Sequence, residues 1–429
     1  VEWLPPPDAR PSLSCALVSP GRAESPVLPL PKTPILSWPC LASSTSRSPA
    51  ADLVAVDAAT HRLMTTSGRA ALYQALLRLG AAAGRRVLVP SYHCPSMVAP
   101  VVHAGLVPQF YAIRADGSPD LEHLALDATD PPAAIIVAHY FGLPQSMRAV
   151  RAWCDNRGVV LIEDCAHCFF GQAGERPVGQ WGDYAIASLT KFFALPEAGL
   201  LVSNRGPLRA ASLKQAGFKA ELKGAVDVLE LASIHGRLRG LTTILRAVFA
   251  AKNFVRGTGS PKPSDEAGTA VDMADCDMKR SGDAPLRLSQ LLFRIQGRAR
   301  IHRRRRENYS AYAAALSHLP GIRPLAPELP ADAAPYVFPL LVNDAERIYH
   351  ALRRGGMPVF RWDRVWPGAP GLPDDHAPAW QRHLLQLLCH QDLGPNDIAE
   401  VCGAVRQLLQ NRSEGQGCRD FNRCADSPL

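Results

Sequence analysis

From residue 51 onward, short apolar runs alternate with segments in which apolar residues recur every three or four positions. The short runs have the length of buried strands and lie at residues 86–89, 107–112, 134–138, 159–162, 183–188 and 199–203. The periodic segments predict helices at residues 67–79, 96–104 and 147–157. Strands that alternate with helices in this way predict a doubly wound, mostly parallel sheet covered by helices.

The rest of the chain has a different pattern of apolar and polar residues. A long helical pattern at 288–316, a strand at 336–342 and helices at 345–354 and 395–409 predict a smaller α+β domain. Pro and Ser dominate the start of the chain, and Gly, Pro, Ser and Asp dominate the segment before the long helix. We therefore expect an extended or disordered N-terminal arm (1–50), a large domain (51–254), a linker or mobile insertion (255–285), a small C-terminal domain (286–410) and a tail (411–429).

Composition narrows the class of protein. With 47% hydrophobic and 20% charged residues in 429, the chain is an ordinary globular protein. The net charge of +8 comes mostly from scattered Arg, and the one dense run, 303–306, lies within a helical pattern, where it predicts a solvated face rather than a nucleic-acid site. No run approaches the roughly 20 apolar residues of a membrane helix. We expect no nucleic acid, membrane or metal partner, and the eleven unclustered cysteines favour reduced thiols and a cytoplasmic protein.

Lys191 is a candidate for chemistry because of its surroundings. It lies in Ser-Leu-Thr-Lys-Phe-Phe-Ala-Leu at 188–195, between two strand-like apolar runs. Burial disfavours an ammonium ion, lowers its pKa and provides the neutral amine that forms an imine with an aldehyde. A lysine at a strand end that reaches solvent with its charged tip would show the same pattern.

An acid ends one of the predicted strands. Val159-Val-Leu-Ile-Glu-Asp places Asp164 at the carboxyl end of a parallel strand, where open α/β sheets bind ligands. Pyridoxal 5′-phosphate (PLP) needs such an acid, because a carboxylate beside the pyridine nitrogen keeps that nitrogen protonated and lets the ring accept electrons from the substrate. Asp164 would equally serve as the cap of the following helix.

Small polar residues open the helix predicted at 67–79. Thr-Thr-Ser-Gly-Arg-Ala-Ala-Leu at 65–72 places Ser67 and Gly68 just before an Ala/Leu-rich stretch. Unpaired backbone N–H groups at a helix start suit a phosphate. Any helix capped by serine shows the same motif, so on its own it indicates little.

Six motifs of the chain occur in the order found in the DegT/DnrJ/EryC1/StrS family of PLP-dependent aminotransferases, which the chain resembles over about residues 60–205. They are Ser-Gly-Arg-Ala-Ala-Leu (67–72), Val-Pro-Ser-Tyr (89–92), Ala-His-Tyr-Phe-Gly-Leu-Pro (138–144), Ile-Glu-Asp-Cys-Ala-His (162–167), Pro-Val-Gly-Gln-Trp-Gly-Asp (177–183) and Ser-Leu-Thr-Lys (188–191). A looser likeness runs from Arg287-Leu-Ser-Gln to the C-terminal helix.

The resemblance implies an α/β, aspartate-aminotransferase-like fold of type I, with a PLP-binding large domain and a smaller α+β domain. It also implies transfer of an amino group from glutamate to a keto sugar linked to a nucleotide, by a homodimer with its sites at the interface. Lys191 corresponds to the Schiff-base lysine and proton shuttle, Asp164 to the pyridine-binding aspartate and His167 to the residue at the cofactor's hydroxyl side. The phosphate-binding positions correspond to Ser188, Ser67, Gly68 and Arg69.

The chain departs from the family pattern at three places near the site, and one of them is the segment before Lys191, which is shorter than the commonest family form. The aromatic residue that stacks on the PLP ring is matched by Cys94, so that stacking falls to Tyr92 or His93 or is absent. Where relatives carry an Asn that contacts the neighbouring subunit's phosphate, this chain has Pro285 before Arg287. Arg287 is then the candidate for reaching the neighbour's site, unless it only forms an ion pair at a helix start.

Two other functions stay open at this point. The poorly matching region 207–285 allows a PLP-binding homologue without transaminase activity, acting as a regulatory or scaffold subunit. Nucleic-acid binding through the run 303–306 is the third hypothesis. Related dehydratases carry histidine at the lysine position, so Lys191 favours the aminotransferase.

Overall fold

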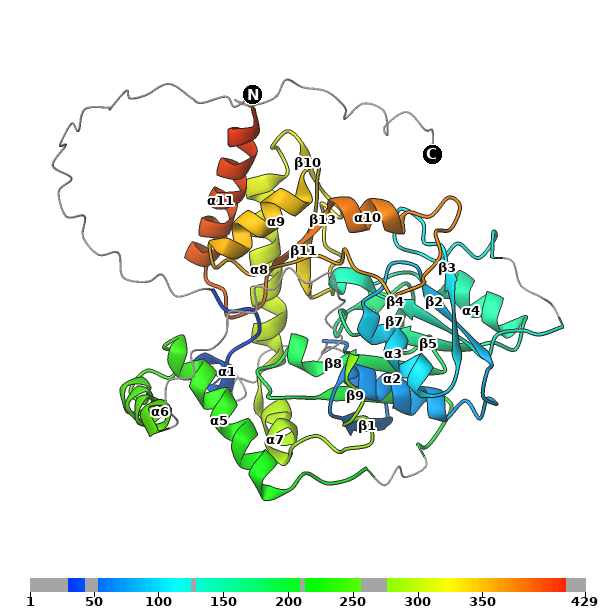
Figure 1. Cartoon of the computed structure of the whole chain (residues 1–429), viewed down its shortest axis with the longest axis horizontal. Coiled ribbons are helices and arrows are strands. Elements are labelled where there is room, and N and C mark those ends of the chain that lie inside the picture. Colours follow the sequence, from blue (N-terminus) through cyan, green and yellow to red (C-terminus); the bar gives the residue numbers. More distant parts are fainter. Residues whose placement is uncertain (1–29, 43–52, 125–128, 209–212, 256–275, 414–429) are drawn as a thin grey trace, which may run out of the picture.

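The computed structural model describes residues 30–42, 53–124, 129–208, 213–255 and 276–413, and the statements below concern this part of the chain. A seven-stranded sheet with helices against it forms the large domain, and a four-stranded sheet with its helices forms the C-terminal domain beside it (Figure 1). The predicted α/β fold with a smaller α+β domain is confirmed.

The large sheet has the strand order β1-β9-β8-β5-β4-β2-β3. Its strands are β1 (His61–Thr65), β2 (Arg86–Pro90), β3 (Val107–Tyr111), β4 (Ala134–Ala138), β5 (Val160–Asp164), β8 (Tyr184–Ser188) and β9 (Gly199–Ser203). The five strands from β3 to β8 are parallel, whereas β9 and β1 are antiparallel to their neighbours. All five residues of β4 are buried, as expected for a parallel strand covered on both faces.

The register of the central strands brings their carboxyl ends to one level. Asp164 pairs with Ala138 of β4 and with Ile186 of β8. The helix α2 (Gly68–Leu77) begins near this edge, and the Oγ of Ser67 caps it by accepting from the Ala70 N–H. Two further helices of this domain are α3 (Pro95–His103) and α4 (Arg148–Asp155).

The C-terminal domain is an antiparallel sheet in the order β10-β11-β13-β12, with long helices packed against it. Its elements are α8 (Arg298–Leu316), β10 (Ile322–Pro324), β11 (Val337–Val342), α9 (Ala345–Arg354), β12 (Val359–Phe360), α10 (Ala377–His383), β13 (Leu384–Leu388) and α11 (Pro395–Ser413). Shorter elements of the chain are α1 (Trp38–Ala42), η2 (Val56–Ala58), η3 (Tyr140–Gly142), β6 (Gln172–Ala173), β7 (Arg176–Pro177) and η4 (Leu189–Lys191).

The long helix predicted at 288–316 is two helices. The helix α7 (Arg287–Ile295) ends at Gln296, whose backbone is extended (φ −78°, ψ 132°), and α8 starts at Arg298. The interpretation of the run 303–306 as a solvated face is wrong for one member, because the Arg305 side chain is fully buried while Arg303 is 66% exposed. Helical periodicity turns Arg305 inward together with Tyr309 and Tyr312.

Two segments expected to lack structure are packed where the structure describes them. Residues 30–42 of the predicted N-terminal arm lie against the body, with Ile35 fully buried. The described part of the predicted linker, residues 276–285, contacts α2 and the residues just before it. Thr66 Oγ donates to the Arg280 carbonyl, and Gln74 Nε2 donates to the Ser281 carbonyl. Residues 1–29, 43–52, 256–275 and 414–429 lie outside the described residues.

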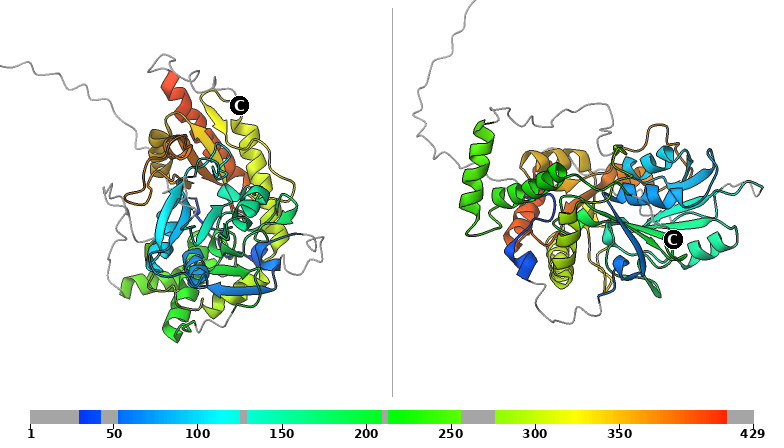
Figure 2. Two further views of the ribbon diagram at one scale, coloured as in Figure 1. Left: turned by 90° about the vertical axis from the view of Figure 1, so that its right-hand side faces the viewer. Right: turned by 90° about the horizontal axis from the view of Figure 1, so that it is seen from below.

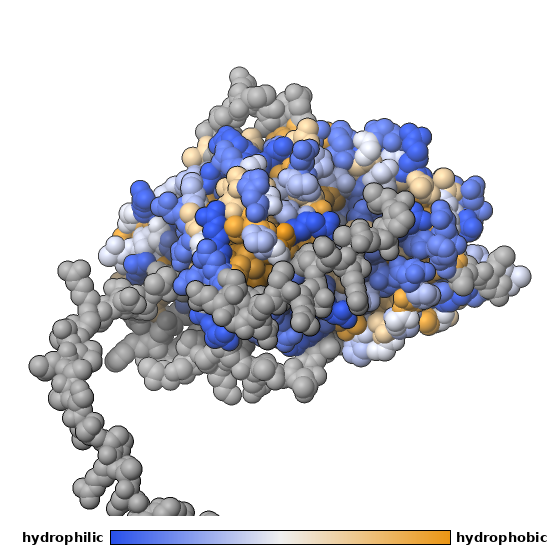
Figure 3. All heavy atoms as spheres, turned by 90° about the horizontal axis from the view of Figure 1, so that it is seen from above, coloured by the Kyte–Doolittle hydropathy of each residue, from blue (hydrophilic) through white to orange (hydrophobic). Residues whose placement is uncertain are grey.

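The helices α5 (Phe218–Ile234) and α6 (Thr242–Val255) were not predicted. They pack on each other, and α5 also packs on α7, so that α6 lies at the outer edge of the molecule (Figures 1 and 2). The face seen from above is mainly hydrophilic, with apolar residues gathered toward its centre (Figure 3). Within the described part of the chain, none of the helices has the length and apolar character needed to cross a bilayer.

Candidate active site

A cavity of about 390 Å³ lies at the carboxyl ends of β4, β5 and β8, and the C-terminal domain closes one side of it. This is the edge where open α/β sheets bind ligands, and the volume suits a small organic molecule. Of the residues predicted for the site, those that line the cavity are Ser67, Gly68, Arg69, Cys94, Asp164, His167, Ser188 and Lys191. Segments separated by more than a hundred residues therefore meet where the sequence motifs predicted.

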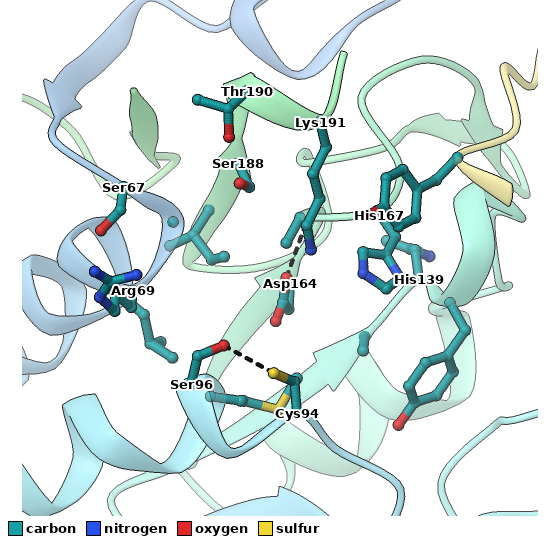
Figure 4. Close-up of a pocket in the computed structure, with 18 of the residues that line it drawn as sticks. Ser67, Arg69, Cys94, Ser96, His139, Asp164, His167, Ser188, Thr190 and Lys191 are labelled. Atoms are coloured by element: carbon teal, nitrogen blue, oxygen red, sulfur yellow. Dashed lines mark hydrogen bonds between the residues drawn. The ribbon is translucent and has the colours of Figure 1, made fainter. Parts of the chain in front are cut away.

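Lys191 ends the short turn η4, directly after β8. Its side chain points into the cavity, with the amine facing the carboxylate of Asp164 (Figure 4). The Nζ atom also lies 5.2 Å from the centre of the Tyr336 ring, which belongs to the C-terminal domain. The amine is thus placed between an acid on the sheet and an aromatic wall.

Asp164 is the last residue of β5 and is only 7% exposed. Burial raises the pKa of its carboxyl, while the Ala166 N–H, which donates at 2.8 Å, and the charge of Lys191 act in the opposite direction. A carboxylate in this environment is stabilised by any cation that a ligand brings to it. A protonated ring nitrogen is such a cation.

His167 is a neutral hydrogen-bond donor toward the cavity. Burial, and then the positive charge of Lys191, hold the pKa of its imidazole well below the usual range. Nδ1 accepts from the Phe141 N–H at 3.4 Å, which assigns the proton to Nε2. The ring lies between Tyr336 and Trp362, with centroids 4.5 and 4.8 Å away.

The end of the cavity that lies away from His167 has the features of an anion-binding site. Ser67, Arg69, Ser188 and Thr190 lie on one side of Lys191, and His139 and His167 lie on the other (Figure 4). A Cβ added to Gly68 would lie 3.2 Å from the Cβ of Ser188, so glycine lets the start of α2 lie close to the end of β8. The backbone N–H groups at such a helix start suit an anion.

Of the three residues considered for ring stacking, only Cys94 lines the cavity. It receives a hydrogen bond from Ser96 Oγ at 3.1 Å. His93 is fully buried elsewhere, with Nδ1 on the Pro90 carbonyl and Nε2 accepting from the Trp366 N–H, and burial lowers its pKa to about 4. Tyr92 is 1% exposed and packs edge-on against Trp380. The structure therefore brings neither aromatic ring into the cavity.

The aromatic wall of the cavity was missed by sequence reasoning. It is formed by Tyr336, which directly precedes β11, by Phe360, which ends β12, and by Trp362, which follows β12. No local pattern distinguishes these rings from core aromatics, and only the packing of the two domains brings them to Lys191. Gly199 was also missed: a Cβ there would lie 2.1 Å from the Ser67 carbonyl oxygen, so glycine lets β9 pass the start of α2.

His139, Glu163 and Cys165 place possible metal-ligand atoms within 4.8 Å of one another, but hydrogen bonds engage the histidine and the acid. Glu163 accepts from His139 Nε2 at 2.8 Å and from the N–H groups of Gly179, Trp181 and Gly182. Burial would raise the pKa of Glu163, yet these bonds hold it below its usual value. Since Nδ1 of His139 accepts from the Gln145 N–H, the group is a structural network that supports the cavity floor.

The fold defines a class of protein. The aminotransferase TlmJ from Streptoalloteichus hindustanus aligns with 90% of this chain and all of its own, at 19% identity and a TM-score of 0.57. PseC from Helicobacter pylori, an aminotransferase involved in the biosynthesis of pseudoaminic acid, aligns over the same shares at 16% identity and a TM-score of 0.59. The chain therefore has the type I aminotransferase fold.

Residues 50–241, less than half of the chain, match the DegT/DnrJ/EryC1/StrS aminotransferase family. GDP-perosamine synthase from Vibrio cholerae is 29% identical over 147 residues, 34% of this chain and 40% of the relative. L-glutamine:2-deoxy-scyllo-inosose aminotransferase from Streptoalloteichus tenebrarius is 28% identical over 218 residues, 48% of this chain and 50% of the relative. The chain thus spans half or less of the length of these relatives.

Proposed function

We propose that the protein is a PLP-dependent aminotransferase that moves an amino group from glutamate, or from glutamine, to the carbonyl of a keto sugar carried on a nucleotide, as the family resemblance implies. The observation that carries the proposal is the amine of Lys191 facing the carboxylate of Asp164 inside the cavity, between an anion site and an aromatic wall. The match of residues 50–241 to the aminotransferase family and the activities of the relatives support the same chemistry.

The residues present fit PLP at each of its functional groups. Lys191 would hold the aldehyde carbon, Asp164 the pyridine nitrogen and His167, through its Nε2–H, the phenolic oxygen. The phosphate would occupy the anion site formed by Ser67, Gly68, Arg69 and Ser188. When bound, PLP supplies an electron sink for the substrate carbon that carries the amino group.

The chain's own residues supply the remaining chemistry. Asp164 would stay ionised next to a protonated ring nitrogen, since each charge would stabilise the other in a buried place. The amine of Lys191 takes a proton from the substrate carbon and later delivers one, as its position in the cavity allows. Tyr336, Phe360 and Trp362 exclude water from this exchange.

The active unit in this proposal is a homodimer. Phe218 and Leu222 on α5 are 79% and 55% exposed, and Leu291 on α7 is 54% exposed, although α5 and α7 pack together. Exposed apolar residues that are so large favour coverage by a second subunit. Arg287 starts α7 beside them, with its backbone N–H on Glu221 and its side chain exposed outside the cavity lining, so it is free to serve a neighbour's site.

The half-reaction with an amino donor tests the proposal. Protein loaded with PLP and mixed with glutamate, or with glutamine, should lose its visible absorbance and release the corresponding 2-oxo acid. Lys191→Ala should do neither. Full PLP binding without release of an oxo acid from either donor would instead identify the non-transaminase homologue. Cytoplasmic localisation stays a prediction.

A further inference from the structure

The backbone of residues 191–194 is held by buried side chains from distant parts of the chain. This segment leaves η4 and does not join a strand, so its polar groups need other partners. Arg305 donates to the Lys191 carbonyl at 2.5 Å, and Gln391 to the Phe192 carbonyl at 2.8 Å. Gln296 accepts from the Ala194 N–H at 2.9 Å and donates to its carbonyl at 3.1 Å.

Arg305 is unusual among these partners because it carries a charge. It is 0% exposed, and in the described part of the chain its hydrogen bonds go only to neutral oxygens. Its guanidinium also lies 4.4 Å above the ring of Phe192. Burial lowers the pKa of Arg305 to about 10, so the group stays a cation at neutral pH. Burying a cation without a carboxylate partner costs free energy, so an arginine in this state needs an explanation.

The same guanidinium reaches both walls of the cavity. One Nη atom contacts the Lys191 carbonyl, and the other donates to the Pro335 carbonyl at 2.9 Å. Pro335 precedes Tyr336, whose ring lies over the Lys191 amine. The Nε atom donates to Gln391, which in turn holds Phe192. The planar guanidinium of arginine has several N–H groups in fixed directions, so it can donate to all three of these oxygen atoms at once. The ammonium group of lysine does not have this geometry.

We infer that Arg305 is a positioning residue for the proposed reaction: it fixes the backbone of Lys191 against the wall formed by Tyr336 and places a permanent positive charge behind the lysine. This inference rests on the proposed function. An arginine that served stability alone would leave the chemistry at Lys191 unchanged once the protein is folded.

The charge of Arg305 shifts protonation at Lys191 in a definite direction. A cation behind Lys191 disfavours protonation of the nitrogen that joins lysine and cofactor, whereas the opposing carboxylate favours it. The titratable and charged groups that line the cavity around Lys191 are Asp164 (β5), His167 (the loop after β5), His139 (directly after β4), Arg69 (α2), Cys94 (directly before α3) and Tyr336 (directly before β11), and Arg305 (α8) lies behind the lysine. Removing Arg305 therefore raises the pH midpoint of the visible absorbance band.

Three variants of the full chain loaded with PLP test the inference. Arg305→Met removes the charge and the fork, Arg305→Lys keeps the charge without the fork, and Arg303→Met is the matched control on the exposed face of the same helix. The measurements are the pH midpoint of the visible band, the rate of borohydride trapping on Lys191, kcat and KM, and the melting temperature.

For Arg305→Met we expect the pH midpoint to rise by about one unit and kcat to fall by about tenfold to a hundredfold with a small change in KM. Arg305→Lys should keep the midpoint but trap more slowly and turn over more slowly. Arg303→Met should match the wild type in every readout.

The inference is overturned if Arg305→Met and Arg303→Met share the same midpoint, trapping rate and kcat. Should Arg305→Met fail to fold, Arg305→Lys decides, because wild-type trapping and turnover in that variant also overturn the inference. Failure of the proposed function looks different: the wild type itself would then form no visible band and trap no cofactor on Lys191.

Discussion

Replacing Asp164 by asparagine separates catalysis from stability. The amide keeps the shape of the side chain and can still accept from the Ala166 N–H, but it loses the charge at the end of β5. For two unit charges about 4 Å apart and an effective dielectric constant of about 20, the lost interaction is about 4 kcal/mol. If the reaction's transition state depends on that interaction, kcat falls by about a thousandfold. Lys191 and the anion site remain, so PLP should still bind.

Stability should respond in the opposite direction. Burial raises the pKa of Asp164 in the folded protein, so the stabilisation present below the unfolded-state pKa is lost as the pH rises through the folded-state pKa. Asparagine removes this buried ionisable group, and with it the loss of stability that follows its ionisation. Cofactor-free Asp164→Asn should melt no lower than the wild type.

The assay combines single-turnover kinetics with glutamate and thermal melting of the cofactor-free proteins. Asp183→Asn is the matched control, because Asp183 accepts from the Leu161 N–H at 2.8 Å and pairs with Arg151, away from the cavity. It should lower the melting temperature and leave kcat nearly unchanged. Near-normal turnover in Asp164→Asn would show that the acid at this strand end has been misassigned.

Four further outcomes are expected. Borohydride reduction should fix the pyridoxyl group on Lys191, and peptide mapping to another lysine would contradict the assignment. Gly68→Val should weaken PLP binding, measured by titration, by about tenfold or more, because even a Cβ there lies 3.2 Å from a neighbouring Cβ. Light scattering should show a dimer that Phe218→Glu or Leu291→Glu dissociates with loss of activity; a fully active monomer would exclude the shared site. The pKa of Glu163 is lowered in the folded protein, so its contribution to stability is present above its unfolded-state pKa and is lost as the pH falls through the folded-state pKa. Glu163→Gln should therefore lower the free energy of unfolding by about 3 kcal/mol at neutral pH, measured by urea denaturation. The stability of this variant should also depend less on pH in the acid range.

Local pattern was sufficient for the central strands and the residues at their ends. The fully apolar β4 and the acid that ends β5 are legible because a parallel sheet buries both faces and leaves polar groups at its carboxyl edge. Lys191 and Asp164 could be placed in one site for that reason. Their predicted roles as catalytic residues stay predictions.

Other parts of the site depend on tertiary packing that no short segment reveals. The run Leu-Leu-Gln-Leu-Leu of β13 fits a buried helix as well as a strand, so this strand was not predicted. Arg305 stands in a run of arginines, and only the rotation of α8 separates it from the exposed Arg303 and the half-buried Arg304 and Arg306. Trp362 reaches the cavity from a domain more than 150 residues away from Lys191 in sequence.

The packed segment 30–42 bears on how the chain folds during synthesis. The Leu30 N–H donates to the Gly356 carbonyl, and the Ile35 N–H donates to Asp392, 357 positions further along the chain. Contacts between such distant positions form late, because a long loop must close before they stabilise anything. On the ribosome, the hydrogen bond of the Ile35 N–H therefore cannot form until Asp392 has emerged, whereas the packing of Ile35 on Ala232 and Leu238 needs much less of the chain.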